Sequence, residues 1–210
     1  MVALPVFADN LLRRIRYGAP ITVVSGLPRS GTSMAMKMLE AGGMTILTDG
    51  AREADEQNPN GYFELEAVKG LDKQADASWL PQARGNAVKI VSHLLTWLPE
   101  IYDYRVIFME RGLDEVLASQ NKMLDDRGLA ADAGDADDAK RAFERHLAQT
   151  KAFLAHRSCF RTLTINYGDA VRDPGAAAAR IAAFLGRRMD VTAMAAVADA
   201  GLYRNRVPMQ

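Results

Sequence analysis

Hydrophobic and polar positions alternate in blocks along the chain. Four short apolar runs, rich in β-branched and aromatic residues, are typical of buried strands: 21–26 (ITVVSG), part of 86–95 (NAVKIVSHLL), 104–110 (YRVIFME) and 161–168 (RTLTINYG). Helical patterns cover 9–17, 34–43, 113–128, 140–156, 175–186 and about 190–200. Strands that alternate with helices predict a parallel sheet covered on both faces. The expected fold class is therefore α/β, with three layers α/β/α and a central parallel sheet.

Polar and small residues mark the connections between these blocks. Residues 48–61 (TDGAREADEQNPNG) predict a loop, and the segment after them (YFELEAVKGLDKQA) predicts the start of a helix. The acidic segment 130–139 (AADAGDADDA) predicts a flexible connection between two helices. The length favours one domain over 1–210, with an N-terminal helix within 1–18 and a basic tail at 201–210.

Composition narrows the classes of function. Lys plus Arg and Asp plus Glu number 26 each, whereas a general nucleic-acid binder normally carries a basic excess. The single cysteine excludes a disulfide framework and a cysteine-based zinc cluster, and the three histidines lack metal-ligand spacing. The chain shows neither a signal peptide nor an apolar run long enough to span a bilayer. We therefore expect a cytoplasmic protein with no metal, no nucleic acid and no membrane partner.

A strand, a glycine-bearing loop and a helix follow one another around 26–33 (GLPRSGTS). Gly31 permits close approach of the backbone to an anion, and the first N–H groups of the next helix point toward it. Thr32 and Ser33 add hydroxyl donors, and Arg29 adds a forked cation suited to phosphate or sulfate. The alternative is a turn that only reverses the chain. The agreement of strand, loop, helix and cation favours an anion-binding loop.

The loop differs from a Walker A motif in the position of its cation. A Walker A motif has Gly, four residues, Gly, Lys, and then Ser or Thr. Here Thr32 holds the lysine position, and Arg29 supplies a cation earlier in the loop. The usual lysine contact with the β- and γ-phosphates of a nucleoside triphosphate is therefore missing. The loop keeps the anion cradle without the expected ATPase chemistry.

This loop resembles the 5'-phosphosulfate loop of the sulfotransferases that use 3'-phosphoadenosine 5'-phosphosulfate (PAPS). In that family a Pro-Lys/Arg-Ser-Gly-Thr core follows the first strand, and the arginine version is similar to bacterial and protein-tyrosine sulfotransferase-like members. The resemblance covers about 20–187 with gaps and implies a P-loop nucleotide-binding fold. It implies that Arg29 contacts the phosphosulfate and that the 5'-phosphate is held by Ser30, Gly31, Thr32 and Ser33. Met34 departs from the cytosolic enzymes, which carry a tryptophan there to stack on adenine.

A second anion motif follows the apolar run 104–110. Arg111 ends that run, and Ser119 lies eight residues later on the following helical pattern. The family's 3'-phosphate motif has an arginine and a serine at this separation, with an acid four residues after the arginine, here Glu115. The resemblance therefore implies that Arg111 and Ser119 bind the 3'-phosphate. Gly112 and Leu113 replace the family's usual Asn-Pro, which implies a different local turn.

Two further matches lie toward the end of the chain. TINYGDAVRDP followed by ARIAAFLG resembles the family's segment near the adenine, which implies that Tyr167 lies beside the base. The alternative is a tyrosine that closes a strand against the next helix. Arg204 and Arg206 resemble a late basic loop that folds over the 3'-phosphate. The alternative for these two arginines is a disordered basic terminus.

Sulfuryl transfer also needs a base for the proton of the acceptor. Cytosolic members of the family use a histidine two residues after a strand-borne lysine. Lys89 matches the lysine, but His93 lies four residues after it. Glu64, in NPNGYFE, is the other candidate, because related bacterial and tyrosine-directed enzymes use a glutamate. We favour Glu64 slightly over His93.

Three functions stay open on these residues. The first is a PAPS-dependent sulfotransferase that acts on a hydroxyl or amine of a small acceptor without a metal and releases 3'-phosphoadenosine 5'-phosphate (PAP). The second is a kinase-like P-loop enzyme with a degenerate loop, against which stand Thr32 and the lack of an evident Walker B aspartate. The third is a nucleotide-binding protein without catalytic activity.

Overall fold

Four parallel strands form the central layer of the molecule. The computed structural model describes residues 6–50, 61–73, 77–126 and 136–198. Its strands are β1 (Ile21–Gly26), β2 (Ala87–Lys89), β3 (Tyr104–Glu110) and β4 (Phe160–Asn166), in the order β2-β1-β3-β4. Each neighbouring pair is parallel, with Val23 of β1 opposite Val88 on one side and Val106 on the other.

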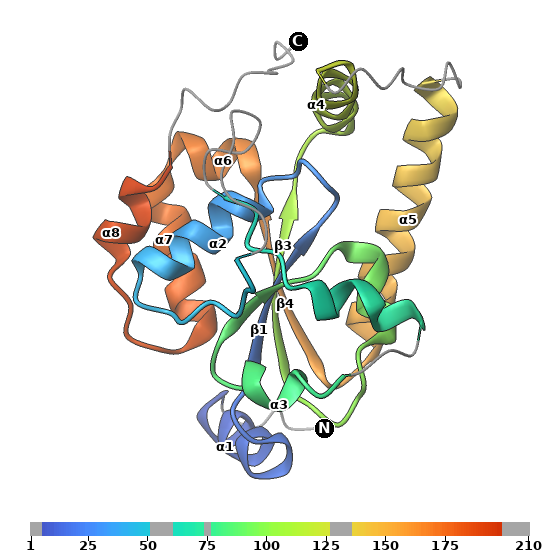
Figure 1. Ribbon diagram of the computed structural model, residues 1–210. Helices are drawn as coiled ribbons and strands as arrows, with labels where there is room; N and C mark the ends of the chain where they lie inside the picture. The colour runs from blue at the N-terminus through green and yellow to red at the C-terminus, as the bar shows by residue number, and fades with distance from the viewer. Residues whose placement is uncertain (1–5, 51–60, 74–76, 127–135, 199–210) are drawn as a thin grey trace.

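Helices cover both faces of this sheet (Figure 1). One face carries α2 (Thr32–Ala41), α6 (Tyr167–Arg172), α7 (Pro174–Leu185) and α8 (Val191–Ala196). The other carries α5 (Ala136–His156), the short α3 (Leu80–Ala83) and two 3-10 helices, η1 (Glu66–Lys73) and η2 (Ser92–Trp97). In Figure 1, α4 (Leu113–Asp125) lies at the top and α1 (Val6–Tyr17) at the bottom. The predicted α/β class, with a central parallel sheet between helical layers, is confirmed.

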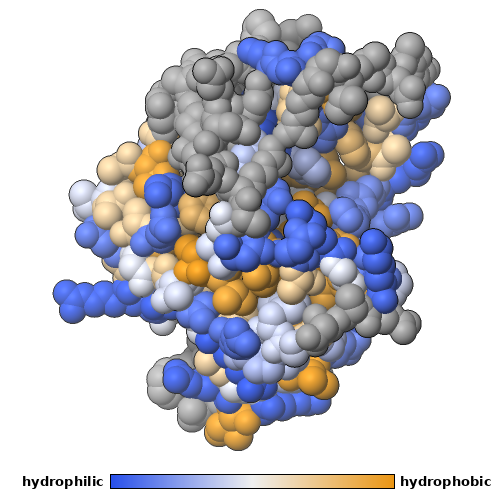
Figure 2. All heavy atoms as spheres, viewed as in Figure 1, coloured by the Kyte–Doolittle hydropathy of each residue, from blue (hydrophilic) through white to orange (hydrophobic). Residues whose placement is uncertain are grey.

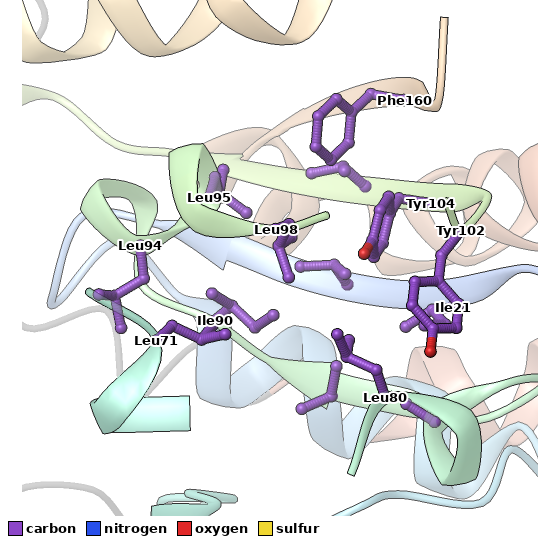
Figure 3. Close-up of a cluster of buried hydrophobic side chains, with 14 of the residues drawn as sticks. Ile21, Leu71, Leu80, Ile90, Leu94, Leu95, Leu98, Tyr102, Tyr104 and Phe160 are labelled. Atoms are coloured by element: carbon purple, nitrogen blue, oxygen red, sulfur yellow. The ribbon is translucent and has the colours of Figure 1, made fainter. Parts of the chain in front are cut away.

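Side chains along the strands alternate between two cores. In β1, Ile21 and Val23 enter the core under α5, whereas Val24 enters the core under α2. Figure 3 shows the first of these cores, in which the rings of Tyr104 and Phe160 stack with their centroids 5.0 Å apart. Because both faces of the sheet are covered, β1 and β3 are buried along almost their whole length, whereas the edge strand β4 has Thr162, Thr164 and Asn166 at exposed positions.

The connections after β1 and β3 leave the sheet toward opposite faces. β1 leads into α2 on one face, and β3 leads through α4 to α5 on the other. Since β1 and β3 are neighbours, their carboxyl ends border a topological switch point. Ligands of open α/β sheets bind at such points. The loop 26–33 and Arg111 both begin there.

Two predicted strands are shorter than expected. The strand within 86–95 ends at Lys89, and its last residues form η2 instead. The predicted bounds of the strand at 161–168 were wrong at both ends, because β4 begins at Phe160 and ends at Asn166. The side chain of Asn166 accepts a hydrogen bond from the N–H of Asp169 and so starts α6, a helix that the sequence pattern did not predict.

Two helix predictions also need correction. The helix expected after position 62 is a 3-10 helix that starts only at Glu66, and Gly70 inside it disfavours an α-helix. The helix expected at 140–156 starts at Ala136, so 136–139 are helical and do not belong to a flexible connection. Asp137 and Asp138 favour this earlier start, because acidic side chains in the first turn complement the helix dipole.

Candidate functional site

The loop 26–33 begins close against the end of β3, and Gly26 also lies close to a side chain of the loop itself. Gly26 has φ 151°, and a Cβ added there would lie 2.5 Å from the carbonyl oxygen of Met109. It would lie equally close to the Oγ of Ser30. The hydroxyl of Ser30 donates to the carbonyl of Leu27 at 2.7 Å, so this side chain fixes the shape of the loop. Only glycine fits at position 26.

Gly31 marks the N-terminus of α2 and lies against an aromatic ring. Its φ of 98° is in the left-handed region, and a Cβ added there would overlap the ring of Tyr167. No side chain of the described residues caps this helix end, at which Thr32 is buried and Ser33 half-buried. An uncapped helix N-terminus behind a glycine is suited to an anion.

Arg29 joins the loop to α4. Its φ of 72° is unusual for a residue with a side chain, which is typical of strained loops at functional sites. Its Nε donates to the Oγ of Ser119 at 3.0 Å. Ser119 itself is 5% exposed. The two residues that the sequence assigned to different phosphates therefore contact each other.

Arg111 lies beside the same loop and is tied down on two sides. Its Nε donates to Glu115 across 2.8 Å, and both side chains are buried. Its Nη1 donates to the carbonyl of Arg29 at 3.4 Å. Its guanidinium carbon lies 4.9 Å from the ring centroid of Tyr167, a distance typical of a cation–π contact.

Tyr167 thus contacts both anion motifs. One part of its ring packs on Gly31, and the ring also faces the guanidinium of Arg111. The sequence suggested a place beside adenine or a role in closing a strand. The described contacts are with Gly31 and Arg111, and both of these suggestions stay predictions.

Lys89 brings a second cation to the loop from β2. Its Nζ donates to the carbonyl of Tyr62 at 2.8 Å and to the Oγ of Ser33 at 3.4 Å. The bond from Lys89 to the carbonyl of Tyr62 was not predicted from the sequence, because a backbone acceptor leaves no sequence pattern. Through it, the segment that carries Glu64 is fixed beside the start of α2.

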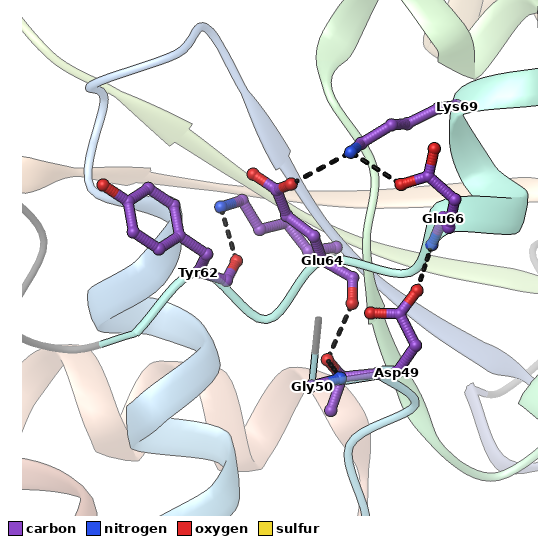
Figure 4. A network of polar contacts seen from close by, with 8 residues as sticks. Asp49, Gly50, Tyr62, Glu64, Glu66 and Lys69 are labelled. Atoms are coloured by element: carbon purple, nitrogen blue, oxygen red, sulfur yellow. Dashed lines mark hydrogen bonds and ion pairs between the residues drawn. The ribbon is translucent and has the colours of Figure 1, made fainter. Parts of the chain in front are cut away.

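Glu64 follows Tyr62 by two residues, and Figure 4 shows it between Tyr62 and Lys69. Its carboxylate lies 3.3 Å from the Nζ of Lys69, which also pairs with Glu66. Its backbone carbonyl accepts from Thr48 at 2.7 Å. The hydrogen bonds that Lys69 donates, first to Glu66 and then to Glu64, raise the pKa of Lys69 above its ordinary value, so this lysine is a cation at neutral pH.

His93 lies on η2, on the side of α5. It is exposed, and in the described part of the chain no contact joins it to the loop 26–33. Its neighbour Ser92 is buried and lies with its Oγ 2.7 Å from the Nε2 of His146. Burial, and then the nearby His93, lower the pKa of His146 below its ordinary value.

Arg204 and Arg206 lie outside the described residues. Within the described ranges no group of three or more His, Cys, Asp or Glu side chains is arranged to hold a metal ion. Met34, at the position of the family's tryptophan, is buried in the core under α2.

Comparison with known proteins gives a distant likeness among solved structures. No protein-family model matches the chain, and no curated protein matches its sequence. Among solved structures, the chain is similar to the sulfotransferase domain from the curacin biosynthetic pathway. The TM-score is 0.47 and the identity 15%, over 91% of this chain and 93% of that domain. At this distance, activity has to be inferred from the chain's own residues.

Proposed function

We propose that the protein transfers the sulfuryl group of PAPS to a hydroxyl or amine of a small acceptor. The observation that carries this proposal is the convergence of Arg29, Ser119 and Arg111 at the switch point between β1 and β3. Arg29 contacts Ser119 at 3.0 Å, and Arg111 contacts the carbonyl of Arg29 at 3.4 Å. Two cations from different strands suit one ligand with two anionic groups, such as a nucleotide phosphorylated at both 5' and 3' positions.

The residues present fit such a donor. The uncapped start of α2, the left-handed Gly31 and the hydroxyls of Thr32 and Ser33 suit its 5'-phosphosulfate. Arg111 pairs with Glu115, and its planar guanidinium is a forked donor of the kind that suits phosphate. Arg111 and Ser119 therefore suit the 3'-phosphate, as the family resemblance implies.

The donor would supply an activated sulfuryl group whose S–O bond to the 5'-phosphate breaks as the acceptor oxygen or nitrogen bonds to sulfur. Arg29 and Lys89 stabilise the negative charge that grows on the departing phosphate oxygen. Glu64 takes the proton of the acceptor, because its segment is fixed beside the loop through Lys89 and Tyr62. His93 is the second candidate for this role.

A kinase-like activity is the alternative that Lys89 keeps open. The loop lacks the Walker lysine, but an ammonium group from β2 lies 3.4 Å from the Oγ of Ser33. A cation there is also able to serve the phosphates of ATP. The two functions differ in donor, so a comparison of ligands separates them.

The test measures the rise of the melting temperature with PAP, ADP, AMP and ATP with Mg²⁺, each over a full concentration series. A ligand that binds only the folded state stabilises it according to its concentration relative to Kd. We expect PAP to stabilise most, since only PAP engages both anion motifs, and we expect PAPS turnover to persist with EDTA. Equal stabilisation by PAP and AMP contradicts the assignment of Arg111 and Ser119. Preference for ATP, with Mg²⁺-dependent turnover, selects the kinase-like function.

A further inference from the structure

In the part of helix α1 whose side chains are described, residues 12–17, Arg13 contacts the protein while Leu12 and Ile15 are exposed to solvent. The Nε of Arg13 donates to Asp103 at 2.9 Å, and its Nη atoms bond Asp103 and the carbonyl of Ser158. Leu12 and Ile15, by contrast, are 53% and 74% exposed. An ordinary surface helix does the opposite and buries its apolar stripe. The body of the protein therefore leaves this apolar surface uncovered.

This helix lies at the amino edge of the sheet. Asp103 directly precedes β3, and Ser158 lies just before β4. Gly85, just before β2, donates from its N–H to the carbonyl of Pro20 at 2.9 Å. Because all four strands are parallel, these contacts lie at the edge opposite to the loop 26–33 and Arg111. Figure 1 shows α1 at the bottom and α4 at the top.

Several exposed arginines lie at the same edge as these apolar residues. They include Arg14, Arg16, Arg84 and Arg187. Arg84 lies beside Gly18, and Arg187 donates to the carbonyl of Gly85 at 3.3 Å. Within the described ranges none of the four pairs with a carboxylate, although the whole chain has zero net charge. Figure 2 shows apolar atoms between hydrophilic ones at the bottom of the molecule.

We propose that this apolar and basic edge, formed by Leu12, Ile15, Arg14, Arg16, Arg84 and Arg187, docks on an anionic lipid bilayer. Leu12 and Ile15 enter the interface, and the arginines contact the lipid phosphates. A second copy of the chain is a poorer occupant, because pairing through α1 brings the arginines of both copies together. The anionic bilayer supplies negative charge to these four arginines, which pair with no carboxylate among the described residues.

Docking on a surface differs from spanning a membrane. None of the described helices is long and apolar enough to cross one, and the sequence prediction of no membrane partner rested on such spans. A helix that lies in the interface needs only an amphipathic face. The anion site at the opposite edge stays directed away from the bilayer.

Sedimentation with vesicles tests the proposal on the full chain. We expect binding to vesicles of phosphatidylcholine and phosphatidylglycerol in equal parts, none to phosphatidylcholine alone, and release at high salt. Leu12→Ser with Ile15→Ser should abolish binding. Arg14→Glu and Arg16→Glu should each lower the affinity by at least about fivefold, from the contribution of one basic residue near a charged surface.

Controls keep the outcome decisive. Lys37→Glu reverses an exposed charge on α2, away from this edge, and should leave vesicle binding unchanged. Unaltered circular dichroism of each variant excludes loss of fold. Equal binding to neutral vesicles, or unchanged binding after Leu12→Ser and Ile15→Ser, overturns the proposal. So does an absence of vesicle binding with a dimer that these two substitutions dissociate, which would assign the surface to a second copy.

Discussion

The guanidinium of Arg29 hydrogen-bonds the hydroxyl of Ser119 across 3.0 Å, although ninety positions separate the two residues. Arg29 belongs to the loop after β1, and Ser119 lies on α4 after β3. The contact joins the two strand ends that border the switch point. The contact brings the motif after β1 and the motif after β3 together in one candidate site.

Substitution of Arg29 separates chemistry from binding. If the guanidinium stabilises charge on the departing oxygen, its contact strengthens in the transition state. Arg29→Ala should then lower kcat by about a hundredfold or more, as the loss of an oxyanion donor does. Arg29→Lys should keep much of the activity, because a point charge is able to reach the same oxygen. Steady-state kinetics with PAPS check this, and a change in KM alone would make Arg29 a ground-state anchor.

Substitution of Arg111 should act on donor affinity instead. Arg111→Ala removes a buried cation from the proposed 3'-phosphate site and should weaken PAP binding by about 2–4 kcal/mol in titration calorimetry. AMP, which lacks the 3'-phosphate, should bind the variant and the parent nearly equally. Arg172→Ala is the matched control, since this arginine is exposed on α6 and, among the described residues, pairs with the exposed Asp169. A parallel loss of PAP and AMP affinity would contradict the assignment.

The central strands β1 and β3 were predictable from the sequence because they are buried on both faces. Continuous apolar runs such as ITVVSG are the direct result of that burial. The loop 26–33 was predictable for a similar reason, because its glycines have backbone geometry or close contacts that other residues cannot adopt. Burial of a strand and the backbone geometry of a glycine each restrict the residue types at neighbouring positions, so both can be recognised in the sequence.

Contacts between distant elements left no such pattern. The packing of Tyr167 on Gly31, the bond from Lys89 to the carbonyl of Tyr62 and the outward face of α1 each depend on how elements meet in space. The short helix α6 was missed because its cap, Asn166, also ends a strand. Sequence spacing selected the residues of the candidate site, whose roles stay predictions, but it did not predict the bonds between them.

The burial of His146, with His93 nearby, predicts a pH dependence of stability. Burial lowers the pKa of His146 in the folded protein below the unfolded value of 6.5, so the unfolded state binds more protons between the two values. The stabilisation from neutral His146 is therefore present above 6.5 and is lost as the pH falls through the folded pKa. His146→Gln should flatten this acid-side decline, measured by urea unfolding at pH values that bracket 6.5. His156→Gln, at the exposed end of α5, is the control.

The identity of the base can be decided with three substitutions to glutamine. Glu64→Gln should lower kcat by at least about a hundredfold, within the range for loss of a general base. His93→Gln should leave kcat nearly unchanged, because no described contact joins His93 to the loop. Glu66→Gln is the matched control for Glu64, since both carboxylates pair with Lys69. A large loss with His93→Gln and none with Glu64→Gln would reverse the assignment.

The role of Gly31 can be measured against a second glycine of nearly the same backbone geometry. Gly31 has φ 98° and Gly43 has φ 86°, but a Cβ added at Gly43 meets nothing within 4 Å. Gly43→Ala should cost about 1–2 kcal/mol of unfolding free energy, from the left-handed backbone alone. Gly31→Ala should cost about 1–3 kcal/mol more, because its methyl group overlaps the ring of Tyr167.

The same pair of substitutions separates stability from function. Displacement of Tyr167 also disturbs Arg111, whose guanidinium faces that ring at 4.9 Å. Gly31→Ala should therefore abolish PAP binding, measured by calorimetry below the melting temperature of the variant, whereas Gly43→Ala should leave it intact. Tyr167→Ser in the Gly31→Ala background removes the overlap and should recover part of the stability, so that the two substitutions are not additive. If the double variant is destabilised by the full sum of the single effects, Tyr167 is not what makes glycine necessary at position 31.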